Sequence, residues 1–135
     1  MNLEQEKYSR YSLVKEMMGT VPTVAEFDPS CVCAVAESLR RTGRMFFTGE
    51  GSSRIMPAKN ARRRAVNVQC DGARQALGYE LSQYTVLVDS NSGRTKEALT
   101  LAKKLKAEGH RELFSLSANE DTPIEKECVS GSVLK

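Results

Sequence analysis

Two short loops rich in glycine and serine place the strongest constraint on what this chain can fold into. The first is Gly49-Glu50-Gly51-Ser52-Ser53, which follows the apolar run 44–48. The second is Ser90-Asn91-Ser92-Gly93-Arg94-Thr95, which follows the apolar run 85–89. Glycine lets the backbone turn sharply and approach a ligand, and serine can cap the following helix, whose first N–H groups attract anions. One such loop is a weak signal, but a pair after two strand-like runs predicts a phosphate site built from both.

Helical and strand-like segments alternate along residues 28–135. Asp28 and Pro29 supply an N-cap and a first-turn proline for a helix that Gly43 ends. We expect strands at 44–48, 66–70, 85–89 and 113–117, and helices that begin at Ser52 or Ser53 and cover 95–108. Thr122 and Glu125 match a capping box for a short helix over 123–128, and a fifth strand opens at 132. The alternation predicts an α/β fold of three layers, with ligands at the carboxyl ends of parallel strands.

Residues 1–27 form a separate amino-terminal segment. They are charged and helix-permissive, with an irregular apolar stripe over residues 11–18. Gly19 and Pro22 are expected to end the helix, because proline disrupts a helix interior. We expect an arm that packs either on the domain formed by residues 28–135 or on a partner subunit.

Composition argues against several classes of function. The 135 residues carry a formal net charge of +3 with acidic and basic residues interleaved, so neither nucleic acid nor a membrane surface is an expected partner. No apolar run is long enough for a secretory signal or a transmembrane helix. The four cysteines lack the CxxC spacing of zinc and redox sites, so we expect no metal, no cofactor and a cytoplasmic location.

Together the two loops resemble the paired signatures of the sugar isomerase (SIS) domain family, G-x-G-(S/T)-S and S-x-S-G-x-T. The likeness covers roughly residues 28–135 and includes the turn at Thr122-Pro123. It implies a flavodoxin-like parallel sheet of four to five strands in the order 2-1-3-4-5, which we expect to stop at or near the fifth strand. It also implies phosphosugar binding, as in the amino-terminal half of amino-sugar phosphate isomerases and deaminases and of ketose/aldose isomerases.

The resemblance assigns the phosphate and sugar contacts to the two loops. The residues carried over are Gly49, Gly51, Ser52, Ser53, Ser90, Asn91, Ser92, Gly93 and Thr95. Enzymes of this family take their catalytic groups from segments after the fifth strand, so we expect an incomplete domain that binds but lacks a full active site. The implied partner is a phosphorylated sugar or amino sugar, bound by a homodimer or a higher homo-oligomer.

Alternatives remain open at this stage. Glu50 could orient a sugar hydroxyl or act as a base, although a carboxylate beside a phosphate is electrostatically unfavourable. A non-catalytic sensor or regulatory module would use the same pocket. A dinucleotide-binding protein would place Asp71 against a ribose, but Arg54 stands where the third glycine of that fingerprint belongs, and the second loop would be left unexplained.

Overall fold

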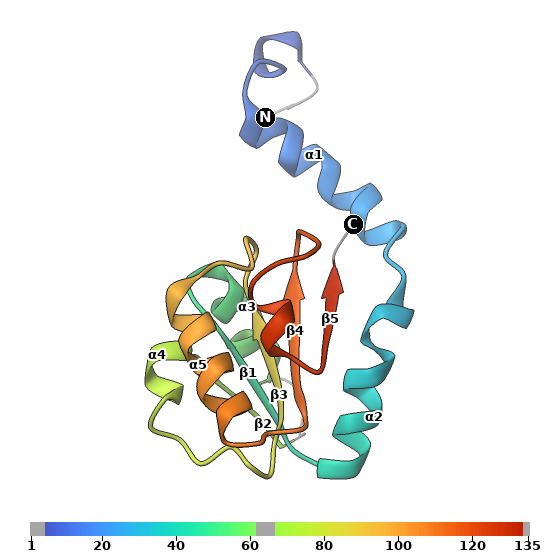
Figure 1. The fold of residues 1–135 in the computed structure, drawn as a ribbon. Helices are drawn as coiled ribbons and strands as arrows, with labels where there is room; N and C mark the ends of the chain where they lie inside the picture. The colour runs from blue at the N-terminus through green and yellow to red at the C-terminus, as the bar shows by residue number, and fades with distance from the viewer. Residues whose placement is uncertain (1–4, 62–66, 134–135) are drawn as a thin grey trace.

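A five-stranded parallel sheet forms the centre of the molecule in the computed structural model, which describes residues 5–61 and 67–133 (Figure 1). The strands are β1 (Met45–Gly49), β2 (Val68–Gly72), β3 (Thr85–Asp89), β4 (Leu113–Ser117) and β5 (Ser130–Val133). Their order is β2-β1-β3-β4-β5, and every pair is parallel. The predicted α/β/α fold and strand order are therefore confirmed.

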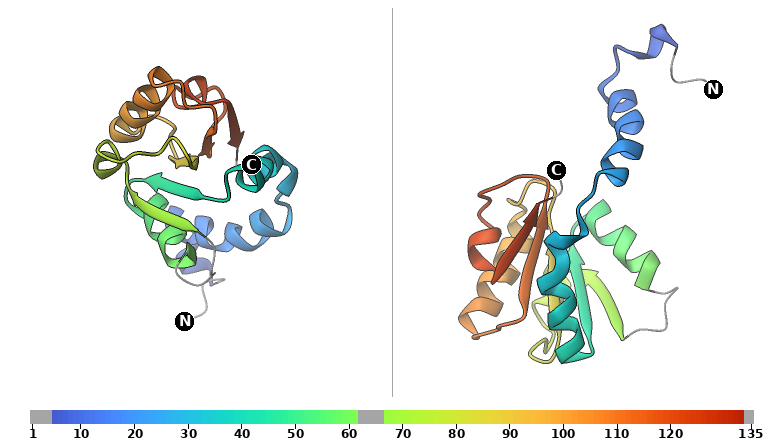
Figure 2. Two further views of the ribbon diagram at one scale, coloured as in Figure 1. Left: turned by 90° about the horizontal axis from the view of Figure 1, so that it is seen from below. Right: turned by 90° about the vertical axis from the view of Figure 1, so that its right-hand side faces the viewer.

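Helices cover both faces of the sheet, as Figure 2 shows in the view along the strands. Helices α2 (Cys33–Thr42) and α3 (Ser52–Ala61) lie on one face, and α4 (Ala73–Ala76) and α5 (Lys96–Ala107) lie on the other. Each face buries its own apolar cluster, as expected when alternate side chains of a strand point to opposite faces. The larger cluster includes Phe46, Val86, Val88, Leu101, Leu105 and Ile124, and the smaller one consists of Val35, Met45, Leu87 and Phe114.

A hydroxyl network joins α2 to the amino end of β3. The Thr85 hydroxyl oxygen lies 2.6 Å from that of Ser38 and 2.8 Å from that of Thr42. Both Ser38 and Thr85 are fully buried, so their hydroxyls depend on this bonding for satisfaction. As predicted, α2 ends at Gly43, whose φ of 65° is in the left-handed region.

His110 joins two connections at the amino end of the sheet. Its Nδ1 accepts a hydrogen bond from the Glu112 backbone N–H at 3.2 Å, and its Nε2 lies 2.9 Å from the Leu81 carbonyl oxygen. Because Nδ1 accepts, the ring proton resides on Nε2 and is donated to Leu81. A cavity of about 500 Å³ lies beside this imidazole, between residues 79–82 and 104–112.

The amino-terminal arm consists of a short turn, η1 (Glu6–Tyr8), and helix α1 (Ser12–Ala25). It projects away from the sheet (Figure 2), and none of the α1 side chains is buried. The expectation that Gly19 and Pro22 end the helix is wrong, because α1 continues through both. The Thr23 hydroxyl donates to the Gly19 carbonyl, and the Glu26 N–H donates to the Pro22 carbonyl.

Two boundaries after β4 also differ from the expectation. Residues 123–128 hold only the 3₁₀ turn η3 (Glu125–Glu127), and the Thr122 hydroxyl is buried with no hydrogen-bond partner, so the predicted capping box does not form. Strand β5 begins at Ser130, two residues earlier than expected. At the start of α2, by contrast, Asp28 does cap the 3₁₀ turn η2 (Pro29–Val32), through the Ser30 N–H at 2.8 Å.

Candidate functional site

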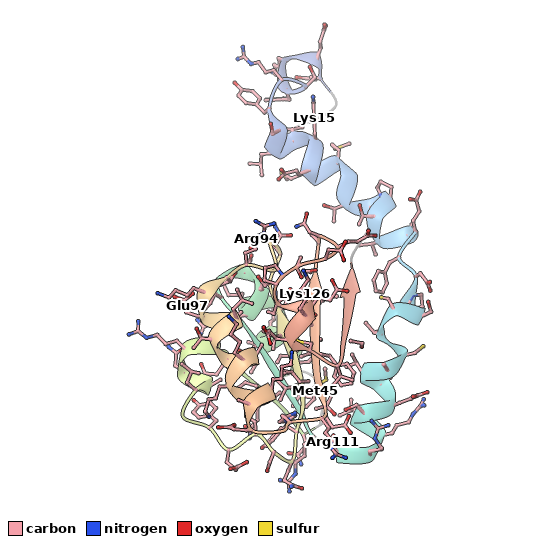
Figure 3. The ribbon with its side chains drawn as sticks, in the orientation of Figure 1. Lys15, Met45, Arg94, Glu97, Arg111 and Lys126 are labelled. Carbon is pink, nitrogen blue, oxygen red and sulfur yellow. The ribbon has the colours of Figure 1, made fainter. Side chains whose placement is uncertain are left out.

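The two predicted loops meet at the carboxyl edge of the sheet. The chain leaves β1 for α3 on one face and leaves β3 for α5 on the other, although β1 and β3 are neighbours. This reversal of direction is the topological switch point at which open α/β sheets bind their ligands. Figure 3 shows Arg94 of the second loop at this end of the domain, with Met45 and Arg111 toward the other.

In the first loop, Gly49 has no room for a side chain. A Cβ there would lie 2.7 Å from the Asp89 carbonyl oxygen and 3.0 Å from the Ser53 Cβ, so only glycine fits between β3 and α3. Gly51 has a φ of 60°, and its carbonyl accepts hydrogen bonds from the N–H groups of Arg54 and Ile55. Ser52 is exposed and Ser53 is half-buried at the amino end of α3.

In the second loop, the hydroxyls differ in exposure. Ser90 is 2% exposed, and its Oγ lies 2.9 Å from the Thr95 Oγ1. Only one of these two hydroxyls donates in their mutual bond, so the proton of the other is free for a ligand. Ser92 and Asn91 are exposed, and the Ser92 Oγ accepts the Arg94 N–H at 3.2 Å, which leaves the Ser92 proton available.

The β4–η3 connection supports the second loop from behind. The Asn91 carbonyl accepts hydrogen bonds from the Ala118 N–H at 3.1 Å and from the Asn119 side-chain amide at 3.0 Å. The Gly93 carbonyl accepts the Ile124 N–H. Gly93 packs against Thr122 so closely that an added Cβ would lie 2.3 Å from the Thr122 Cβ. Sequence reasoning included the Thr122-Pro123 turn in the resemblance but did not find this contact.

Two acidic side chains near the first loop are engaged elsewhere. The Glu50 carboxylate accepts the Arg74 N–H at 3.4 Å, at the amino end of α4. Asp71 ends up beside the loop, as the dinucleotide alternative required, but it accepts the Tyr79 hydroxyl at 2.5 Å and the Gly72 N–H at 2.8 Å. The Tyr79 hydrogen bond, followed by that of Gly72, holds the pKa of Asp71 below its ordinary value.

Asp89, which sequence reasoning treated only as the end of a strand, lies at the switch point itself. It pairs with Gly49 in the sheet register, and its carboxylate accepts a hydrogen bond from the Ser53 side chain. Burial raises the pKa of this carboxyl, and the Ser53 hydrogen bond opposes the rise. The missed signal was register, because Asp89 meets the first loop only once β1 and β3 are known to be neighbours.

Within residues 5–61 and 67–133, no group of three or more His, Cys, Asp or Glu side chains is arranged to hold a metal ion. In the same residues, no helix has the length and apolar character needed to cross a bilayer.

Comparison with known proteins places the fold. No protein-family model matches the chain, and no curated protein matches its sequence. Solved structures do match it. The c3406 protein of E. coli CFT073, solved in complex with a phosphosugar, has a TM-score of 0.68 at 22% identity, over 90% of this chain and 71% of that one. The sugar isomerase domain of the RpiR transcription factor from Sphaerobacter thermophilus has a TM-score of 0.65 at 12% identity, over 90% of this chain and 72% of that one.

A third structure is the Vibrio vulnificus NanR protein complexed with ManNAc-6P. It has a TM-score of 0.65 at 16% identity, over 95% of this chain and 52% of that one. Identities this low establish a shared fold. The chain therefore has the fold of sugar isomerase domains, as the two loops predicted, with both signature loops at the switch point.

Proposed function

We propose that this chain binds a phosphorylated sugar, with its phosphate held between the first and second loops. The observation that carries the proposal is the meeting of the two loops at the β1/β3 switch point, each at the start of a helix of ten or more residues. Backbone N–H groups of two helix starts, together with hydroxyl donors, favour a dianion without requiring a lysine. The phosphosugar complexes of c3406 and NanR support this ligand class.

The proposed donors with a free proton are Ser52, Ser92 and one hydroxyl of the Ser90–Thr95 pair. Asn91 is exposed next to Ser92 and is proposed to contact the sugar. Gly49, Gly51 and Gly93 act by allowing the backbone to approach the ligand, and Ser53 completes the first loop. Glu50 points its carboxylate to α4, so we propose no catalytic role for it.

Calorimetric titration with ManNAc-6P and with a panel of other sugar phosphates tests the proposal. The double variant Ser52→Ala/Ser92→Ala removes two exposed hydroxyls and should weaken binding by about tenfold to a hundredfold, since a hydrogen bond to a charged group is worth about 1.5–3 kcal/mol. Thr100→Ala, which removes an exposed hydroxyl of α5 away from the loops, is the matched control and should bind as the wild type does. Equal affinity of the double variant and the control would contradict the site assignment.

Two activities could use such a site. In an amino-sugar phosphate isomerase or deaminase the bound sugar is converted, whereas in a sensor it is only held, and the match to the sugar isomerase domain of a transcription factor favours the second as an alternative. Incubation of the protein with each bound phosphosugar separates them. Formation of the isomeric sugar, or release of ammonia from an amino sugar, supports the enzyme, and binding without conversion supports the sensor.

We further propose that the protein forms homodimers through α1. Leu13, Met17, Val21 and Val24 stand at spacings of i, i+4, i+8 and i+11, which places them along one side of the helix. They are 65%, 53%, 75% and 70% exposed, so the arm does not cover this stripe itself. A second α1 is the occupant that matches the length and apolar character of the stripe.

Cys33, Cys70 and Cys128 are free thiols, which is consistent with a cytoplasmic protein. Burial raises the pKa of Cys128 to about 11, so this thiol resists oxidation. Recovery of the protein outside the cytoplasmic fraction of its source cells would contradict this location.

A further inference from the structure

The carboxylate of Asp89 occupies an unexpected place for a site that is to receive a dianion. Asp89 is the last residue of β3 and immediately precedes the second loop, and it pairs in register with Gly49 of the first loop. Its carbonyl oxygen would lie 2.7 Å from a Cβ on Gly49, so the two backbones are in close contact. The negative charge therefore lies at the junction of both loops.

The hydrogen bond between Asp89 and Ser53 determines what Ser53 can offer to a ligand. A serine hydroxyl has one proton, and an ionised carboxylate is an acceptor only. While Asp89 is ionised, the Ser53 proton is committed to it, and Ser53 presents only lone pairs to the space between the loops. A phosphate or sulfate oxygen also has only lone pairs, so the two cannot form a hydrogen bond in that state.

Protonation of Asp89 reverses this arrangement. The neutral acid can donate its own proton to the Ser53 oxygen, and the Ser53 hydroxyl is then released to donate to an anion. The same proton removes the repulsion between the carboxylate and the incoming charge.

We propose that anion binding between the two loops is coupled to uptake of one proton from solvent by Asp89, which makes Asp89 a positioning residue that switches Ser53 from acceptor to donor. The inference rests on the proposed phosphosugar site and deepens it by assigning the proton that accompanies the ligand. Burial, which raises the pKa of Asp89, supports the coupling because it brings the neutral acid closer to physiological pH.

Other charged groups near Asp89 do not provide an equivalent switch. On α3, Arg54 is paired with Asp71, with Nη1 and Oδ1 3.6 Å apart, and Lys59 is in the last turn. Glu50 is directed to α4, Arg94 is exposed in the second loop, and β1 and β4 carry no charged residue. His110 is the only histidine in the chain and lies at the opposite end of the sheet.

Inorganic sulfate is the suitable probe, because it stays doubly charged over the relevant pH range whereas phosphate itself titrates. Sulfate dissociation constants are measured from the amide NMR shifts of Gly49 and Gly93 between about pH 7 and about pH 4.5. We expect wild-type affinity to rise about tenfold as the pH falls, since an acid with a raised pKa becomes neutral over this interval. Asp89→Asn should bind at about pH 7 nearly as tightly as the wild type does at low pH, with a change of less than about twofold across the range.

Asp71→Asn is the control, because it removes the same charge from the end of the neighbouring strand and should keep the wild-type pH profile. A parallel pH dependence in wild type and Asp89→Asn, or the same effect from Asp71→Asn, would overturn the coupling while leaving the phosphate site intact. Failure of sulfate and of inorganic phosphate to bind either protein at any pH would overturn the anion site itself, and the coupling with it.

Discussion

Single glycines of the two loops have different surroundings despite similar backbone conformations. Gly51 and Gly93 have φ values of 60° and 62°, a region that disfavours any side chain. Nothing lies within 4 Å of a Cβ built on Gly51, whereas one on Gly93 would meet the Thr122 side chain at 2.3–2.6 Å. Gly51 is therefore required by conformation alone, and Gly93 by conformation and packing together.

Gly93→Ala should accordingly destabilise the protein more than Gly51→Ala. We expect a loss of about 1 kcal/mol in the free energy of unfolding for Gly51→Ala, from the left-handed conformation, and about 1–3 kcal/mol more for Gly93→Ala, from the clash with Thr122. Urea denaturation of both variants measures the difference. Equal losses would show that the second loop does not press on the β4–η3 connection.

The buried hydroxyls of Thr85 and Thr122 provide a second comparison. The Thr85 hydroxyl bonds to Ser38 and Thr42, and the Thr122 hydroxyl has no partner among the described residues. Thr85→Val should cost about 1–3 kcal/mol because it leaves buried partners unsatisfied, and Thr122→Val should be neutral or stabilising by up to about 1 kcal/mol. Thermal unfolding of the two variants distinguishes them, and a large loss in Thr122→Val would reveal a bond that this hydroxyl makes in solution.

Among the elements, the buried strands were the most predictable. The expected bounds 85–89 and 113–117 are those of β3 and β4, because a strand covered on both faces appears as an uninterrupted apolar run with abrupt polar ends. Strand β2 begins two residues later than expected, at Val68. It lies at the edge of the sheet, where only one neighbour constrains it.

Helix α1 shows where local rules fail. Pro22 lacks the N–H that would bond to the fourth residue before it, so a stop was expected, yet the helix continues to Ala25. Side-chain hydroxyls compensate nearby, since Thr20 donates to the Glu16 carbonyl and Thr23 to the Gly19 carbonyl. Such bonds depend on geometry that residue spacing alone does not specify.

The candidate site was predictable as a pair of loops but not in its details. Spacing identified every glycine and serine of both loops, because each strand-to-helix turn has a local signature. The partnership of Ser53 with Asp89 and the packing of Gly93 on Thr122 depend on strand order and on a connection 29 residues further along the chain. Contacts between distant segments leave no periodic trace in a sequence.

Considered as a whole, the molecule has its arm and its candidate site at the same end. In Figure 1 the strands point toward the end from which α1 rises, so the carboxyl edge and the base of the arm are neighbours. If α1 pairs with a second copy, the partner subunit approaches the two loops. Self-association and ligand binding are thus expected to be linked in this protein.

Disruption of the α1 stripe should produce monomers. Met17→Glu/Val21→Glu places two charges in the apolar stripe, and we expect the wild type to sediment as a dimer and the variant as a monomer. Thr20→Glu, which adds a charge on the polar side of the same helix, is the control and should remain dimeric. A wild-type protein that sediments as a monomer would contradict the proposed dimer.

The single imidazole of the chain offers an internal reporter for all of these measurements. His110 holds its two connections together by hydrogen bonds at the edge of the sheet opposite the loops. Its ring protons give isolated NMR resonances, and their chemical shifts should respond when the domain unfolds and remain unchanged when an anion binds at the far edge. One spectrum can therefore separate loss of structure from occupancy of the site without any added label.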